Sequence, residues 1–106
     1  MQSKLTVKRK PTKDDSCTLV LRGEIDMDTY EILEHKLATA VSDGKLHITL
    51  DLSGITFISS GGFGVFIEAA GTVQELGGSL KFINHSEKAR DIFKLLGILL
   101  ESCDFD

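Results

Sequence analysis

The chain has 106 residues, enough for one hydrophobic core and too few for two ordinary domains, so we expect a single domain over residues 1–106. Its apolar fraction of 42% and charged fraction of 26% are typical of a soluble globular domain, and its net charge of −4 disfavours direct binding of nucleic acid. No secretory signal and no run of roughly 18 apolar residues is visible, so we expect a cytoplasmic protein without membrane insertion.

The first part of the chain has the pattern of two strands. Leu5 and Val7 alternate with polar residues over residues 4–8, as in a half-buried strand. Residues 17–23 are rich in β-forming residues, and a polar segment that contains Pro11 separates the two runs. The simplest pairing of two such neighbouring runs is a β-hairpin.

A helix is predicted over residues 28–44. Asp28 is expected to cap its N-terminus, with Glu31 completing a capping box. Gly44 stands where a left-handed residue commonly ends a helix. The apolar stripe expected to face the core comprises Ile32, Leu33, Leu37, Ala40 and Val41.

The second half of the chain alternates strands with helices. Residues 45–52 predict a strand, and continuous apolar character resumes at residues 55–58. A second helix is expected to begin near Gly61 or Gly62. Residues 79–84 predict another strand, and residues 86–97 a third helix. The apolar stripe expected for the second helix comprises Phe63, Phe66, Ile67, Ala70, Val73 and Leu76.

The resulting order, β-β-α-β-α-β-α, predicts an α/β fold. Strands that alternate with helices form a mainly parallel sheet covered by helices, and the hairpin makes the sheet mixed, with about four to five strands. Residues 98–106 are a final strand or a tail. Apolar residues 98–100 are then either a buried closing strand or an exposed contact of a weak homo-oligomer.

Sequence patterns of catalytic and cofactor-binding sites are absent. The chain has no phosphate-binding P-loop, no GxSxG, no HExxH and no CxxC. His35, His47 and His85 are scattered and expected at the surface, and Cys17 and Cys103 are expected to be inert free thiols. We therefore expect no metal, no cofactor and no enzyme, with a nucleotide-binding or hydrolysing domain as the remaining enzymatic alternative.

Three stretches of the chain resemble the STAS domain family, which includes the bacterial anti-sigma factor antagonists. They are LVLRGEIDMDTYEIL, ITLDLSGITFISSGGFGVFI and FINHSEKARDIFKLLGI, and together they extend roughly from Val20 to Ile98. The second is similar to the family motif of Asp-Leu-Ser followed by Asp-Ser-Ser-Gly, a hydrophobic residue, Gly and another hydrophobic residue. Its length and spacing make the resemblance specific.

The resemblance implies a small central sheet with helices packed on it, and a protein partner. In the antagonists this partner is a serine kinase that doubles as an anti-sigma factor, so the module regulates sigma-factor-dependent transcription. The antagonist binds the kinase when unphosphorylated and releases it when a serine at the start of the second helix is phosphorylated. STAS domains also occur as small cytoplasmic subunits that dock on a transporter or its ATPase, which is the alternative.

The chain departs from the antagonist motif at the helix start. Ser59 stands where the family has Asp, Ser60 matches the first serine, and Gly61 stands at the phosphoacceptor position. Asp26 matches the family's other acidic position. Two hypotheses remain open: the switch is lost and binding is constitutive, or Ser60 is a displaced acceptor. A structural role competes with the second, because Ser60 or Ser59 can cap the helix.

The resemblance implies a partner-binding face formed by the loop after the second strand and the start of the second helix. Its members are Asp26, Ser59, Ser60, Gly61, Gly62 and Phe63. Helical periodicity also allows Phe63 to belong to the core. A bulky residue in place of Gly62 is expected to weaken binding without unfolding the domain.

Overall fold

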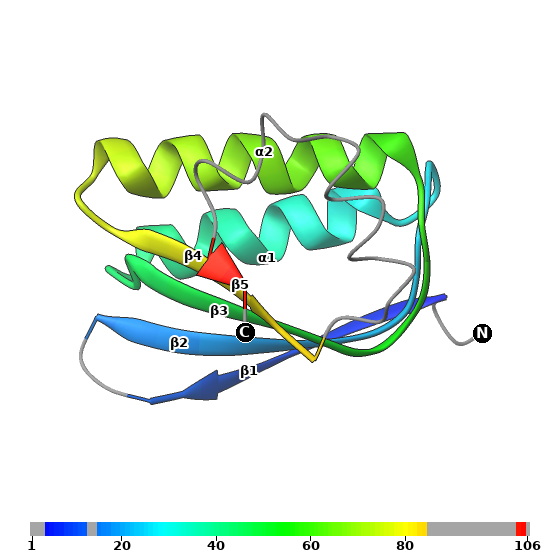
Figure 1. Cartoon of the computed structure of the whole chain (residues 1–106), viewed down its shortest axis with the longest axis horizontal. Coiled ribbons are helices and arrows are strands. Elements are labelled where there is room, and N and C mark those ends of the chain that lie inside the picture. The colour runs from blue at the N-terminus through cyan, green and yellow to red at the C-terminus, as the bar shows by residue number, and fades with distance from the viewer. Residues whose placement is uncertain (1–3, 13–14, 85–103, 106) are drawn as a thin grey trace.

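The computed structural model describes residues 4–12, 15–84 and 104–105, and it forms one sheet with two helices on one face (Figure 1). The predicted order β-β-α-β-α-β is confirmed. The predicted third helix, residues 86–97, and the apolar residues 98–100 lie outside the described residues. The elements are β1 (Leu5–Pro11), β2 (Ser16–Ile25), α1 (Tyr30–Ser42), β3 (His47–Ile58), α2 (Ser60–Glu75), β4 (Ser79–Ile83) and β5 (Asp104–Phe105).

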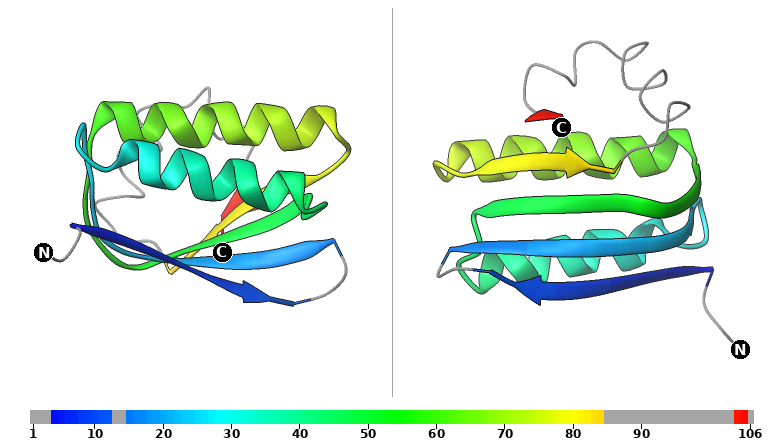
Figure 2. Two further views of the ribbon diagram at one scale, coloured as in Figure 1. Left: turned by 180° about the vertical axis from the view of Figure 1, so that it is seen from behind. Right: turned by 60° about the horizontal axis from the view of Figure 1, so that its bottom comes forward.

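The strands lie side by side in the order β1-β2-β3-β4-β5 (Figure 2). β1 pairs with β2 antiparallel from Leu5 opposite Gly23 to Pro11 opposite Cys17, which confirms the hairpin. The pairs β2–β3, β3–β4 and β4–β5 are parallel, so the sheet is mixed as expected. Since both crossovers through α1 and α2 run over the same face, the helices gather on one side of the sheet.

Gly23 allows the start of β1 to pack closely on β2. Its φ is +111°, in the left-handed region, and a Cβ there would collide with the carbonyl oxygen of Lys4. The same carbonyl accepts a 2.8 Å hydrogen bond from the main-chain N–H of Glu24. The beginning of β1 is therefore tied to the end of β2.

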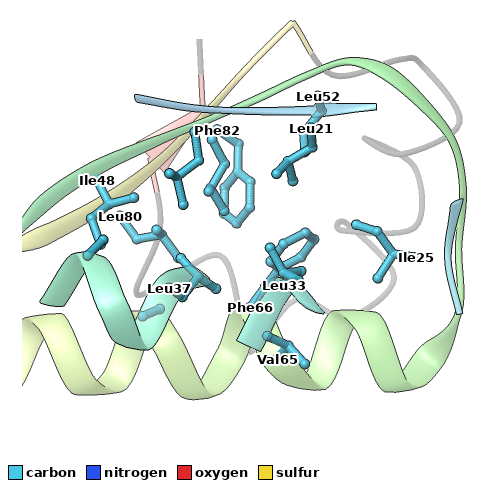
Figure 3. Close-up of a cluster of buried hydrophobic side chains, with 14 of the residues drawn as sticks. Leu21, Ile25, Leu33, Leu37, Ile48, Leu52, Val65, Phe66, Leu80 and Phe82 are labelled. Atoms are coloured by element: carbon cyan, nitrogen blue, oxygen red, sulfur yellow. The ribbon is translucent and has the colours of Figure 1, made fainter. Parts of the chain in front are cut away.

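The core lies between the sheet and the two helices (Figure 3). Alternate residues of β2 face the helices, and Leu19, Leu21 and Ile25 are each at most 1% exposed. Phe66 of α2 packs edge-to-face on Phe82 of β4, with ring centroids 5.1 Å apart. Complete burial of side chains of this size stabilises the fold by about 1.5–3 kcal/mol each, before the entropy of ordering them is subtracted.

The first helix confirms its predicted stripe and its predicted end, but it begins later than expected. Leu33, Leu37 and Ala40 are buried, while Ile32 and Val41 are half-buried against them. Gly44 has a φ of +83°, as a C-terminal left-handed residue requires. The predicted cap at Asp28 is wrong, because Thr29 is the N-cap residue and it makes no side-chain capping bond.

The buried face of α2 is rotated relative to the predicted stripe. Phe63, Phe66, Ala70 and Val73 are buried as expected. Ile67 and Leu76 are 45% and 52% exposed, and Gly62 and Val65 take their places in the core. The rotation follows from where the helix begins, because Gly62 packs directly against the end of β2.

Candidate functional site

The loop after β2 and the start of α2 meet at one end of the sheet. β2 and β3 are parallel neighbours, so both end at the same edge (Figure 1). There the main-chain N–H of Ser59 donates a 2.8 Å hydrogen bond to the carbonyl oxygen of Ile25. This bond places Asp26, the next residue of β2's loop, beside the serine–glycine junction of residues 59–62.

Ser59 caps α2. Its φ and ψ are −80° and 168°, and its Oγ accepts a 3.2 Å hydrogen bond from the main-chain N–H of Gly62. The N–H of Phe63 donates to the carbonyl oxygen of Ser59 at 3.1 Å. The capping role is thus taken by Ser59, which leaves Ser60 as the first residue of the helix.

Ser60 and Gly61 form the exposed part of the junction. The hydroxyl group of Ser60 makes no hydrogen bond with another residue of the described chain. A Cβ placed on Gly61 would meet only Ser59 Oγ, at 3.7 Å, so this position has open space. A hydroxyl and a bare backbone are therefore presented at the positive end of the α2 dipole.

Gly62 and Phe63 lie beneath this surface, so the expectation that Gly62 tolerates a bulky residue is corrected. A Cβ on Gly62 would be 2.5 Å from Cγ2 of Ile25 and 3.1 Å from Cγ2 of Ile58. Phe63 is 3% exposed and packs edge-to-face on Phe66. These two residues fix the position of the helix start, and the residues above them make the surface.

Asp26 organises the loop between β2 and α1. Its Oδ1 accepts a 2.9 Å hydrogen bond from the main-chain N–H of Asp28, and its own N–H donates to Thr29 Oγ1 at 2.9 Å. Its main-chain carbonyl accepts a 2.9 Å hydrogen bond from the N–H of Tyr30, the first residue of α1. Asp26 thus stabilises the turn that Asp28 was expected to stabilise.

Lys4, at the start of β1, faces the carboxylates of this loop. Its Nζ lies 3.3 Å from Asp26 Oδ2 and 3.4 Å from Asp28 Oδ2. Hydrogen bonds and charge attraction from these two residues raise the pKa of Lys4. Burial opposes ionisation of Asp26, yet the hydrogen bonds from Asp28, Lys4 and Thr29 together with the Lys4 charge hold the pKa of its carboxyl below the ordinary value. Asp26 therefore presents a carboxylate that hydrogen bonds and Lys4 hold in place beside the junction.

Two exposed apolar residues, one in the loop after β2 and one near the end of β3, were not singled out from the sequence. Met27 follows Asp26 in the loop and is 84% exposed. Phe57 lies opposite Glu24 at the end of β3 and is 49% exposed. Large apolar side chains at this exposure are frequent anchors of protein interfaces. Met27 stands between two aspartates, which is the signal that could have identified it as a surface residue.

Among the described residues, His35, His47 and Cys17 are not gathered into a site. His35 is exposed, and His47 is exposed with Nδ1 2.9 Å from Ser79 Oγ. Cys17 is buried and unpaired, while His85 and Cys103 lie outside the described residues. In the parts of the chain that are described, no three metal-ligating side chains cluster and no helix is long and apolar enough to cross a membrane.

Comparisons with known proteins show which family the chain is similar to. The profile of the family described as "Mlab, STAS domain" matches residues 9–99. The chain is 32% identical over 78 residues to the anti-sigma-B factor antagonist of Bacillus subtilis, a match that covers 74% of this chain and 71% of the relative.

Two solved structures show the same fold. An anti-sigma factor antagonist from Mycobacterium paratuberculosis superposes with a TM-score of 0.77 at 23% identity, covering 89% of this chain and 79% of that one. The Bacillus cell fate determinant SpoIIAA in its phosphorylated form superposes with a TM-score of 0.75 at 20% identity, covering 95% of this chain and 91% of that one. The profile match and the identity to the Bacillus subtilis relative together show that the chain belongs to the STAS domain family.

Proposed function

We propose that the chain is an anti-sigma factor antagonist that binds a serine kinase doubling as an anti-sigma factor, and so regulates sigma-factor-dependent transcription in the cytoplasm. The relatives that carry a functional name are antagonists of anti-sigma factors, which regulate by binding and are not enzymes. The observation that carries the proposal is the Ile25–Ser59 hydrogen bond, because it joins the loop of Asp26 and the exposed start of α2 into one surface.

The docking surface comprises Asp26, Ser59, Ser60 and Gly61, supported from below by Gly62 and Phe63. Bare glycine backbone at residue 61 lets a partner approach closely. Met27 and Phe57 add the apolar contact area on which interface affinity usually depends. The surface thus combines the apolar side chains of Met27 and Phe57 with the hydrogen-bonded carboxylate of Asp26.

Ser60 is the acceptor of a regulatory phosphate in this proposal. Ser59 already serves as the cap, so the Ser60 hydroxyl has no structural duty toward the described residues. A phosphate there gains from the unpaired N–H groups of the first helical turn. Its charge of about −1.5 to −2 adds to that of Asp26 and repels an acidic or apolar partner surface.

Binding can be tested with two matched glycine substitutions in α2. Gly61→Arg places a large cation in open space at the docking surface, and Gly71→Arg places the same side chain in equally open space further along the helix. Titration calorimetry with the anti-sigma factor kinase of the same organism should show affinity reduced about tenfold or more by Gly61→Arg only. Equal binding by both variants would exclude this surface.

Phosphorylation can be tested separately with kinase, ATP and intact-mass measurement. We expect one added phosphate in the wild-type chain and in Ser59→Ala, and none in Ser60→Ala. Absence of phosphate from the wild-type chain would mean that the switch is lost and the antagonist binds constitutively. Persistence of the phosphate in Ser60→Ala would place the acceptor elsewhere.

A second candidate is a subunit that docks on a transporter or its ATPase. Gly61 favours it, because such a subunit needs no phosphoacceptor at this position. Capture of partners from the native host with the wild-type chain, and loss of the same partners with Gly61→Arg, would separate the two candidates. Recovery of transporter subunits instead of a kinase would support the second.

A further inference from the structure

A groove of about 420 Å³ runs between α1 and α2. Leu37 and Val41 line it from α1, Val65 from α2, and Ile48 of β3 lies at its base. Figure 3 labels Leu37, Ile48 and Val65 in the cluster of buried side chains. Leu37, Ile48 and Val65 are each at most 5% exposed, so the groove ends on a closed apolar floor.

The walls of the groove are low because small residues form them. Ala38 of α1 and Ala69 of α2 stand on either side. The hydroxyl of Thr72, also in the wall, donates a 3.0 Å hydrogen bond to the carbonyl oxygen of Glu68 within its own helix. The Thr72 hydroxyl is therefore already hydrogen-bonded, and the rest of the lining offers apolar contact. Such a groove favours branched aliphatic side chains over polar ones.

Negative charge borders the groove. Glu34 on α1 and Glu68 on α2 line it from opposite sides, and both are exposed. α2 carries Glu68 and Glu75 and no Lys or Arg, and α1 carries Glu31 and Glu34 against the single Lys36. This charge distribution disfavours an anionic lipid or fatty acid and complements a cationic partner.

We propose that this groove binds an amphipathic helix of a partner protein, whose apolar stripe fills the groove and whose flanking Lys or Arg residues pair with Glu34 and Glu68. A helix fits this groove because α1 and α2 run side by side, and the space between two such helices accepts the i, i+3, i+4 and i+7 side chains of a third helix from the partner. Helical spacing also places Val65 and Ala69 on the same face of α2 as Gly61.

The inference goes beyond the proposed function and does not depend on it. The groove is formed by the middle of both helices, whereas the junction is the start of α2 and lies beside the end of β2. A partner that contacts both surfaces gains affinity from each, while a helix that contacts the groove alone still binds. The two proposals therefore fail independently.

The test uses two peptides of about 15 residues, each with a leucine stripe at i, i+3, i+4 and i+7 spacing. One has lysine and the other glutamate on both flanks of the stripe. Fluorescence anisotropy with the full chain should show the lysine peptide binding about tenfold or more tightly. Amide chemical-shift changes should map to Ala38, Val65 and Ala69.

Charge reversal supplies the decisive variants. Glu34→Lys combined with Glu68→Lys should invert the preference to the glutamate peptide, and both positions are exposed, so the fold is preserved. Ala38→Arg, on the exposed rim, should block both peptides without changing the urea midpoint. Equal affinity for the two peptides, no binding, shift changes elsewhere, or a self-associated chain that Ala38→Arg converts to monomer would overturn the proposal.

Discussion

Gly62 shows how one missing side chain sets the position of a helix. A Cβ there would meet Ile25 at 2.5 Å and Ile58 at 3.1 Å, so Gly62→Val should overpack the core and lower the free energy of unfolding by about 1–3 kcal/mol. Gly61→Ala is the matched control, because its Cβ meets only Ser59 Oγ at 3.7 Å. Urea denaturation measures both, and equal midpoints would contradict the packing role.

The two serines beside it are chemically alike but differ in what they contact. Ser59→Ala removes the 3.2 Å bond to the N–H of Gly62 and should cost about 1 kcal/mol of unfolding free energy. Ser60→Ala removes no described contact and should change stability by less than about 0.5 kcal/mol. Thermal and urea unfolding of the pair check the assignment, which is refuted if Ser60→Ala is the more costly change.

At the scale of elements, the loop between β2 and α1 depends on the charge of Asp26. A carboxyl whose pKa is lowered by folding stabilises the folded chain above its unfolded-state pKa, ordinarily 3.8. That contribution is lost as the pH falls through the lower, folded-state value. The urea midpoints of wild type and Asp26→Asn should therefore differ most near neutral pH and converge in acid.

Asp28→Asn is the control for this pH dependence. Asp28 contacts Lys4 at 3.4 Å but is far more exposed, with 79% of its side chain in solvent against 21% for Asp26. Screening by water weakens such exposed pairs, so this variant should resemble the wild type throughout. If the urea midpoints of wild type and Asp26→Asn differed by the same amount at every pH, the packing of the side chain, and not its charge, would stabilise the loop.

The order of the elements could be predicted from the sequence because apolar residues recur at different spacings in strands and in helices. Alternation near Leu5 and Val7 and the β-forming residues 17–23 predicted the hairpin, and the stripe of α1 predicted its buried face. The start of each helix was harder to predict, since Asp26, Asp28 and Thr29 are all capable of ordering the same turn. Only the hydrogen bonds of Asp26 decide between them.

The geometry of the proposed docking surface could be predicted only in outline. Adjacent serines satisfy the same capping pattern, and the backbone at Ser59 decides which one caps. Ile67 and Leu76 fit the helical period as well as Val65 does, but the contact of Gly62 with Ile25 rotates them outward. Exposed anchors such as Met27 carry no periodic signal at all. Local patterns therefore suggest where the proposed surface lies, and long-range packing decides which of its residues are exposed.

At the scale of the whole molecule, Cys17 reports on the opening of the sheet. It is 1% exposed in β2, between β1 and β3, and burial raises the pKa of its thiol despite the opposing charges of Arg9 and Lys45. In a Cys103→Ser variant, the thiol should not react with a disulfide reagent at neutral pH until urea unfolds the chain. Rapid reaction of the native protein, followed by absorbance, would contradict a closed sheet.

The contact of Lys4 with the loop of Asp26 has a practical consequence for any work with fusion proteins. Because β1 begins at the same end of the sheet as the start of α2, an affinity tag or fluorescent reporter attached ahead of Met1 is joined only three residues before Lys4, which contacts this loop (Figure 1). Such a bulky appendage shields that end from a binding protein. Interaction measurements should therefore be made after the tag has been cleaved.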